Sequence, residues 1–331
     1  MTATVPAATT PGGRLVWLDA ARGAAVAAMV AYHLCWDLAF FGLAGFDLTG
    51  DPVWLAARTA ILSAFLAVAG VSLARASVHA PPRGRRWAIR LAMIGGGAAA
   101  ISAGTWFAVS ERFVWFGVLH HLFVAGLAAP LIARLPATAA TGLGLAALVL
   151  PEVAATPALD APWVAWIGLG MAEPATNDWV PVLPWIGVHL LGFAAGRIVF
   201  GRRAAEQAAN GAGAGGRTDG LLRPLARVGR HSLAVYLLHQ PILWGGLWLA
   251  VEGTGVLAPE RADREAAFLA SCERACTDSG ADAATCSAYC GCVRDGLAGE
   301  GLLDRALADR LGDADSAAVN RVVGRCVARE R

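Results

Sequence analysis

Hydrophobic residues along the chain gather into about seven runs, each close to the length that crosses a lipid bilayer. A helix needs roughly 20 residues to span the hydrocarbon core. Each run is expected to be a helix, because an open strand in lipid leaves backbone groups without hydrogen-bond partners. The pattern therefore predicts an all-α fold, a polytopic membrane helix bundle. Its helices are expected at residues 17–42, 53–75, 88–109, 113–134, 137–155, 180–200 and 230–251.

Charged residues in the connections alternate between two types, and this alternation predicts the orientation of the bundle. Residues 75–90 and 197–230 are rich in arginine, whereas residues 43–52 and 152–178 are mostly acidic. Arginine-rich connections are expected on the cytoplasmic side. We therefore place the N-terminus in the cytoplasm, with the chain in a bacterial inner membrane. An odd number of helices then places the residues after 252 outside the cytoplasm.

Composition narrows the classes of function. Apolar residues make up 56% of the 331 residues, which is too many for an ordinary soluble globule. The formal net charge is only +2 and the sequence contains no lysine, so it lacks the diffuse cationic surface of a nucleic-acid-binding protein. We expect membrane lipid as a partner and no nucleic acid.

Two connections have a distinctive composition. Residues 156–179 contain APWVAWIGLGM, which is too short to span the membrane but rich enough in tryptophan to lie in the outer interface or re-enter the bundle. This segment could form a lid over an outward-facing site. Residues 204–220 are rich in glycine and alanine without a hydrophobic period, which predicts a flexible cytoplasmic loop.

Ionisable groups inside a span are costly unless they are paired or hydrated, so they mark candidate functional residues. His33 and Asp37 lie four residues apart on the first predicted helix and share a face. The carboxylate can orient the imidazole and favour its charged form. His33 could then act as a base or a nucleophile.

Four further histidines fall inside predicted spans, at His120, His121, His189 and His239. Counting ~1.5 Å per residue along each helix brings them and His33 to one layer of the bundle. His120 and His121 point about 100° apart, so one is expected to face the cavity while the other packs. The alternative for each histidine is a structural hydrogen bond inside the bundle. We expect no metal, because the histidines lack a paired local spacing.

Basic residues gather at the cytoplasmic ends of two helices. The segment LDAARG places Asp19 and Arg22 three residues apart, where they can form an ion pair. Arg227, Arg230 and His231 precede the last span and, with the arginines of residues 75–90, make a basic mouth suited to a phosphorylated ligand. The alternatives are structural anchoring for Asp19 and Arg22, and membrane orientation alone for the other arginines.

Four segments carry a resemblance to a known family. They are RLVWLDAARGAAVAAMVAYHLCWDL, ERFVWFGVLHHLFVA, VPVLPWIGVHLLGFAAGR and GRHSLAVYLLHQPIL. Their specific elements are Leu-Asp-x-x-Arg-Gly followed by a histidine and Trp36-Asp37, then Gly-x-Leu-His, and finally Gly-Arg-His-Ser with Leu-His-Gln-Pro. In order and spacing, residues 13–250 resemble bacterial relatives of the heparan-α-glucosaminide N-acetyltransferase catalytic domain.

The resemblance implies acyl transfer across the membrane. Acetyl-CoA, as a co-substrate, would bind at the cytoplasmic side, and its acetyl group would pass to an amine or hydroxyl acceptor, such as a glycan, at the outer side. We assign His33 as the reactive residue and Asp37 as its orienter. Acyl-CoA binding is assigned to Asp19, Arg22, Arg227, Arg230 and His231. Acceptor binding is assigned to Trp36, His120, His121, His189 and His239.

Six of the seven cysteines lie after residue 271, and the pattern C-x-x-x-C occurs there twice with nine residues between the pairs. In a helical hairpin this spacing predicts disulfides Cys272–Cys290 and Cys276–Cys286, which leaves Cys292 to pair with Cys326. Such bonds suit a small domain in an oxidising compartment. A zinc or haem site is the weaker alternative. We therefore divide the chain into a transmembrane domain at 1–252 and a periplasmic cysteine-rich helical tail at 253–331.

Two other functions fit the same residues. Buried histidine and aspartate also serve as proton relays, so a transporter or flippase is the first alternative. Inverted repeats or broken helices would favour it, and the sequence shows neither. The second alternative is a non-catalytic membrane scaffold that presents the cysteine-rich tail.

Overall fold

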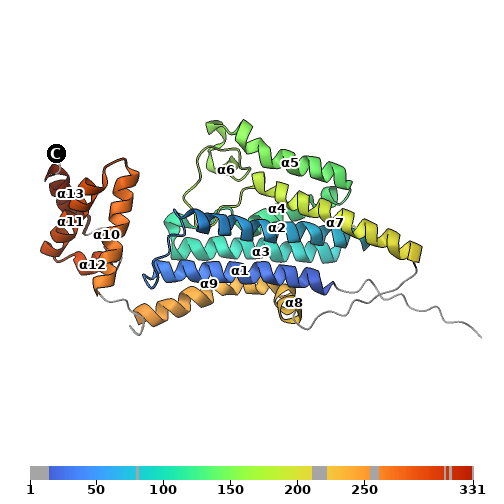
Figure 1. The fold of residues 1–331 in the computed structure, drawn as a ribbon, viewed down its shortest axis with the longest axis horizontal. Coiled ribbons are helices and arrows are strands. Elements are labelled where there is room, and N and C mark those ends of the chain that lie inside the picture. Colours follow the sequence, from blue (N-terminus) through green and yellow to red (C-terminus); the bar gives the residue numbers. More distant parts are fainter. Residues whose placement is uncertain are drawn as a thin grey trace, which may run out of the picture. The chain divides into compact units, whose positions relative to one another are not determined.

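The computed structural model describes residues 15–79, 82–210, 222–253, 261–308, 311–312 and 315–329. Within these residues the chain is helical and contains no strand, so the predicted all-α class is confirmed. All of the predicted apolar runs form helices (Figure 1). They are α1 (Val16–Phe40), α2 (Pro52–His79), α3 (Arg85–Ala108), α4 (Val118–Ile132), α5 (Ala137–Ala154), α7 (Val182–Asn210) and α9 (Ser232–Trp248).

Six of these helices are long and apolar enough to cross a membrane. The exception is α4, an apolar helix of 15 residues that begins later than the predicted residue 113. The preceding residues form a short 3-10 turn, η1 (Ser110–Arg112), and then an extended segment. This segment pairs with a distant one, since the backbone N–H of Val180 donates to the carbonyl of Phe116 over 2.9 Å. Pairing outside the helix therefore shortens α4.

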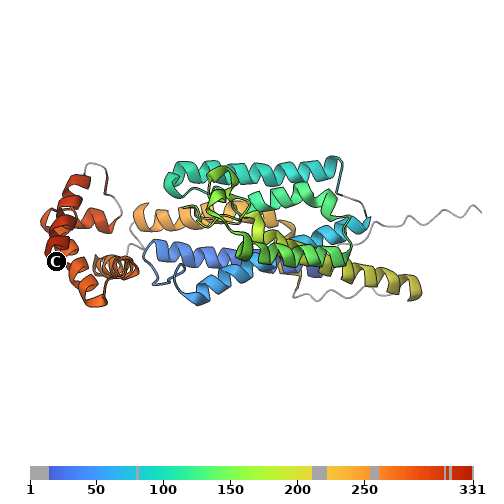
Figure 2. The ribbon, with the colours of Figure 1, turned by 90° about the horizontal axis from the view of Figure 1, so that it is seen from above.

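Contacts divide the chain into two units. The first consists of Met1–His33 and Thr49–Ile242, and the second of Leu34–Leu48 and Leu243–Arg331. In the first unit α7 packs along α2 and α5, and α3 packs on α4. The long helices of this unit run side by side with similar axes (Figures 1 and 2). Its largest core cluster joins α2, α4, α5 and α7 through Ala74, Ile132, Ala140, Leu190, Phe193, Ala194 and Phe200.

Large apolar side chains on the outside of the first unit are exposed rather than packed. Phe107 of α3 is 88% exposed and Val153 of α5 is 74% exposed. In water such side chains would be costly, at about 25 cal/mol for each Å² of apolar surface. Their exposure on helices of spanning length is what a lipid environment requires.

Three connections are more structured than the sequence indicated. Helix α7 continues to Asn210, so residues 204–210 are helical and the expectation of a flexible loop there is wrong; residues 211–221 lie outside the described residues. Helix α8 (Leu222–Arg230) precedes α9, and the π-helical turn η3 (Leu249–Gly253) follows it. The expected lid segment contains η2 (Pro157–Leu159) and α6 (Pro162–Ala165).

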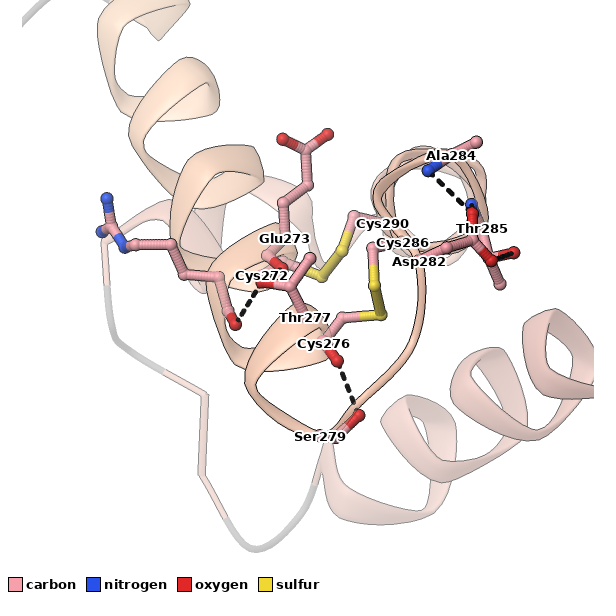
Figure 3. The surroundings of a disulfide bond; sticks show 11 residues. Cys272, Glu273, Cys276, Thr277, Ser279, Asp282, Ala284, Thr285, Cys286 and Cys290 are labelled. Carbon is pink, nitrogen blue, oxygen red and sulfur yellow. Dashed lines mark hydrogen bonds between the residues drawn. A yellow bond between two sulfur atoms is a disulfide. The ribbon is translucent and has the colours of Figure 1, made fainter.

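The second unit contains a disulfide-bonded helical tail. Helices α10 (Arg261–Asp278) and α11 (Ala283–Gly299) form a hairpin, which α12 (Leu303–Leu307) and α13 (Ser316–Arg329) follow. Figure 3 shows the two disulfides that join α10 to α11, Cys272–Cys290 and Cys276–Cys286. A third, Cys292–Cys326, joins α11 to α13. These are the three pairs that the cysteine spacing predicts.

The start of α11 explains how the hairpin turns. The Asp282 carboxylate accepts hydrogen bonds from the backbone N–H of Ala284 at 3.1 Å and of Thr285 at 3.0 Å, which caps the helix. Hydrogen bonds from Thr285 hold the pKa of this carboxyl below its ordinary value. The core beneath the hairpin is small and includes Val322 and Leu297, so the disulfides supply much of the constraint on this unit.

Candidate functional site

Two of the predicted site histidines meet between α1 and α9. The ring centroids of His33 and His239 lie 4.9 Å apart in an edge-to-face arrangement. The side chain of Gln240, the next residue on α9, hydrogen-bonds His33. These three residues come from the first and last long helices of the first unit, so only the tertiary structure brings them together.

The hydrogen bonds of His239 define which of its nitrogens carries the proton. Its Nδ1 lies 2.7 Å from the carbonyl oxygen of Tyr236. A carbonyl only accepts hydrogen bonds, so Nδ1 is the donor and Nε2 of the neutral ring carries a lone pair. Nε2 is buried and has no hydrogen-bond partner within the described residues. His239 therefore holds an available basic nitrogen beside His33.

The other predicted residues of the α1 group follow His33 on the same helix. Asp37 stands one turn later and its exposed fraction is 0%, so its carboxylate is fully buried. Trp36 is 36% exposed. The spacing of His33 and Asp37 on one helix is the predicted one, and the catalytic roles assigned to them stay predictions.

Asp178 connects the loop before α7 to α4 and α9, and no motif in the sequence singles it out. Its Oδ2 accepts a hydrogen bond of 3.0 Å from the backbone N–H of Val118, the first residue of α4. Its carboxylate also accepts a hydrogen bond from the Tyr236 hydroxyl of α9. Burial raises the pKa of Asp178, while these two bonds and the charge of Arg58 oppose the rise. Gly117 makes room for the carboxylate, because a Cβ there would lie 2.7 Å from Cγ of Asp178.

Arg58 on α2 and Tyr32 on α1 are linked to Asp178 by charge. The positive charge of Arg58 acts on both the Asp178 carboxyl and the Tyr32 hydroxyl. The Tyr32 ring contacts Trp54 at 5.8 Å and His33 at 6.3 Å between centroids. A signal for Arg58 existed in the sequence, because it is a charged residue inside an apolar span. Nothing in the sequence indicated that Asp178 lies beside it.

His120 is held by hydrogen bonds at both ring nitrogens. The backbone N–H of Gly117 donates to Nδ1 over 3.2 Å, and Nε2 lies 3.1 Å from Oγ of Ser102. The Ser102 hydroxyl in turn donates to the carbonyl of Val114. His120 therefore ties the start of α4 to α3. It also lines an open cavity of about 600 Å³ whose other walls are Ala99, Ser102, Phe113, Trp115, Phe116, Val124 and Trp166.

His121 and His189 form a second, deeply buried pair between α4 and α7. Their exposed fractions are 1% and 5%. Nδ1 of His121 lies 3.3 Å from the carbonyl of Pro181. Nε2 of His121 and both ring nitrogens of His189 have no partner within the described residues. The predicted histidines thus occupy three surroundings: the pair His33 and His239, the pair His121 and His189, and the site of His120 beside Ser102.

The lid segment is fastened to the start of α4. The Thr176 hydroxyl donates to the carbonyl of Phe113 over 2.7 Å, and the backbone N–H of Asn177 donates to the carbonyl of Arg112. At its other end, Oδ1 of Asp160 accepts the backbone N–H of Met171 over 2.6 Å. The segment is therefore a closed loop with its own hydrogen bonds, and it positions Asp178.

The arginine-rich group assigned to acyl-CoA forms at the crossing of α1 and α8. Nη1 of Arg22 donates to Oδ1 of Asp19 over 2.9 Å, and its Nη2 donates to Oγ of Ser72 on α2 over 2.8 Å. On and after α8 the side chains of Arg227, Arg230 and His231 are exposed. Asp19 and Arg22 are thus fixed inside the protein, whereas the α8 group is available to a ligand.

No group of three metal-ligating side chains occurs within the described residues. The chemistry that the arrangement offers is proton transfer and nucleophilic attack at the two imidazoles, beside a carboxylate, a phenol and a guanidinium. The polar groups come from α1, α2, α9 and the loop before α7 of the first unit.

Comparison with known proteins identifies a family. Residues 14–241 match the model of the heparan-alpha-glucosaminide N-acetyltransferase catalytic domain. The matched range contains the His33 and His239 pair, Arg58, Asp178, Tyr236 and the arginine-rich group, and it ends before the cysteine-rich tail. No curated protein and no solved structure was found to match the chain.

Proposed function

The chain belongs to the heparan-alpha-glucosaminide N-acetyltransferase catalytic family, and from this membership we propose that it transfers an acetyl group from acetyl-CoA to a sugar amine or hydroxyl at the outer side of the membrane. The observation that carries the proposal is the contact between the His33 and His239 rings, at 4.9 Å, within the family-matched residues. Two imidazoles in contact, one with an available basic nitrogen, suit acyl transfer better than a purely structural role.

His33 is the reactive residue of the proposed mechanism. It either takes the acetyl group briefly or removes the proton from the acceptor as the new bond forms. The C–S bond of the thioester breaks, the new C–N or C–O bond forms, and the proton lost by the acceptor ends on the CoA thiolate. We propose that Nε2 of His239, which is buried and has no hydrogen-bond partner within the described residues, holds that proton between its release by the acceptor and its transfer to the thiolate. Asp37, one turn from His33, is the proposed orienter.

Acetyl-CoA would bind at the crossing of α1 and α8, which lies nearer the N-terminal end of α1 than His33 does. Guanidinium groups bind phosphate through paired, charge-assisted hydrogen bonds. Arg227 and Arg230 are exposed and suited to the phosphates of CoA, while Asp19 and Arg22 hold the helices that carry them. Charge placement supports a cytoplasmic location for this end of the bundle in a bacterial inner membrane. The disulfides support an extracytoplasmic location for the tail.

The test is release of CoA from acetyl-CoA by the purified, detergent-solubilised chain, with and without crude outer-leaflet glycans. Wild type is compared with His33→Ala and Asp37→Asn. Thr141→Ala is the matched control, because within the described residues the Thr141 hydroxyl bonds only the backbone of its own helix α5. We expect both site variants to lose about 10²-fold or more of the activity, and the control to keep it.

Folding of each variant is checked by its elution as a monodisperse species and by its thermal unfolding. If the folded wild-type protein neither releases CoA nor binds acetyl-CoA, acyl transfer is the wrong function. A transporter with an intramembrane histidine relay, or a scaffold for the tail, would then replace it.

A further inference from the structure

Arg58 is a charged residue within the apolar span of α2, and its charge acts on Tyr32 and Asp178 without a hydrogen bond to either. It lies six residues after Pro52, about 9 Å along the helix. Its side chain is exposed, and within the described part of the chain its guanidinium makes neither a hydrogen bond nor an ion pair. An arginine in a spanning helix is costly unless it faces water, a partner or a ligand.

The Asp178 carboxylate, on which the Arg58 charge acts, is hydrogen-bonded by other groups. Asp178 already accepts hydrogen bonds from the Val118 backbone N–H and from the Tyr236 hydroxyl. These donors hold the carboxylate at the start of α4, where Arg58 acts on it through charge alone. The five N–H donors of the guanidinium therefore remain available.

The side chains near Arg58 are of the kinds that bind a sugar ring. Tyr32 lies close enough for the Arg58 charge to act on its hydroxyl, and the Tyr32 ring contacts Trp54 at 5.8 Å. Aromatic rings and hydroxyls together pack against and hydrogen-bond a sugar. The Tyr32 ring also lies 6.3 Å from the His33 ring between centroids, so these residues adjoin the proposed reacting pair.

We propose that Arg58 is the anion-binding residue of the acceptor site, and that Tyr32 and Trp54 bind the ring of the same acceptor. The proposal rests on the proposed function and adds that the acceptor carries a phosphate, sulfate or carboxylate group. A guanidinium matches the oxygens of these groups in a two-pronged hydrogen-bonded geometry. The charge would fix the acceptor so that its amine or hydroxyl lies at His33 and His239.

The phosphate of a lipid headgroup would bind a guanidinium in the same way as the anionic group of an acceptor. The experiment therefore separates binding of the acceptor from binding of an anionic lipid. Binding is measured by calorimetry, without acetyl-CoA, to the full chain in nanodiscs of phosphatidylcholine and in nanodiscs that also contain phosphatidylglycerol. The probes are glucosamine 6-phosphate, glucosamine and inorganic phosphate. The proteins are wild type, Arg58→Gln, Arg58→Lys, and the control Arg112→Gln, whose exposed side chain lies in η1.

We expect wild type to bind glucosamine 6-phosphate at least about tenfold more tightly than glucosamine, from one charge-assisted interaction. Arg58→Gln should remove this preference, Arg58→Lys should keep part of it, and Arg112→Gln should leave it unchanged. Inorganic phosphate should compete. Because no turnover is measured, this result stands or falls separately from CoA release.

Three results would overturn the proposal. The first is equal affinity of wild type for the charged and neutral sugars. The second is equal loss of the preference in Arg58→Gln and Arg112→Gln. The third is stabilisation by phosphatidylglycerol that depends on Arg58, with no effect of the sugar phosphate. That result would assign Arg58 to a lipid headgroup instead.

Discussion

Gly23 of α1 and Gly229 of α8 meet backbone to backbone. A Cβ added to Gly229 would lie 2.9 Å from the backbone nitrogen of Gly23, and one added to Gly23 would lie 3.0 Å from that of Gly229. The Cβ added to Gly229 would also meet the backbone carbonyl of Asp19, and the one added to Gly23 would meet that of Leu225. The two family-like motifs Leu-Asp-x-x-Arg-Gly and Gly-Arg-His-Ser therefore contain the two glycines of one helix crossing.

Replacing Gly229 with valine should strongly destabilise the protein, because the added side chain would collide with backbone atoms of α1, which cannot move aside as a side chain can. Overpacking of this kind costs about 1–3 kcal/mol. The measurement is the thermal unfolding of the purified chain in detergent. Gly96→Ala on α3 is the control, since a Cβ there meets nothing within 4 Å. Equal stability of Gly229→Val and wild type would contradict the close crossing.

Arg22 and Arg227 should respond differently to replacement by glutamine. Arg22→Gln removes the bonds to Asp19 and Ser72 and should cost about 1–3 kcal/mol of stability. Arg227 is exposed, so Arg227→Gln should leave stability unchanged while raising the KM for acetyl-CoA by about tenfold. Unfolding and CoA-release kinetics are measured for both variants. A stability loss in Arg227→Gln without a change in KM would remove it from the acyl-CoA site.

His33 and His239 should act as a unit. If His239 holds the proton that His33 transfers, each single alanine variant should lose most of the activity, and the double variant should lose little more. The CoA-release rates of wild type, His33→Ala, His239→Ala and the double variant supply this comparison. Multiplicative losses would mean that the two imidazoles work independently despite their ring contact.

Asp178 should make stability depend on pH in a specific direction. Burial raises the pKa of Asp178 in the folded chain above its ordinary value of 3.8. Its contribution to folding stability is therefore full below pH 3.8 and is lost as the pH rises through the folded pKa. Asp178→Asn cannot ionise and should remove this loss. Unfolding temperatures of both proteins between acidic and neutral pH test the difference. Parallel pH curves would mean that Asp178 keeps its ordinary pKa.

The disulfides should leave Cys35 as the thiol that reacts in the unfolded, unreduced chain. Alkylation in denaturant should add one label before reduction and seven after it, as read by intact mass. Closing the loop between Cys292 and Cys326, which are 34 residues apart, is worth about 4 kcal/mol in the chain-entropy model. Cys292→Ser with Cys326→Ser should therefore loosen α13 more than α10. More than one label before reduction would show that a disulfide is absent from the purified chain.

The sequence by itself determined the helical class, the apolar runs and the cysteine pairing. These features follow from local rules: a span needs a fixed length of apolar residues, and a C-x-x-x-C pair places two sulfurs on one helical face. The same rules identified His33 and His239 as candidates, because a polar group in an apolar run is conspicuous on its own.

Tertiary structure alone decided which polar groups share a site. Asp178 is ordinary in the sequence, and becomes a connecting residue because pairing between residues 112–116 and 176–180 carries it to α4 and α9. His120 is a predicted acceptor-binding residue, and only the structure shows that its two ring nitrogens also hydrogen-bond Gly117 and Ser102. Such contacts depend on helix order and packing over long sequence separations, and periodicity along one chain segment contains no information about its neighbours in space.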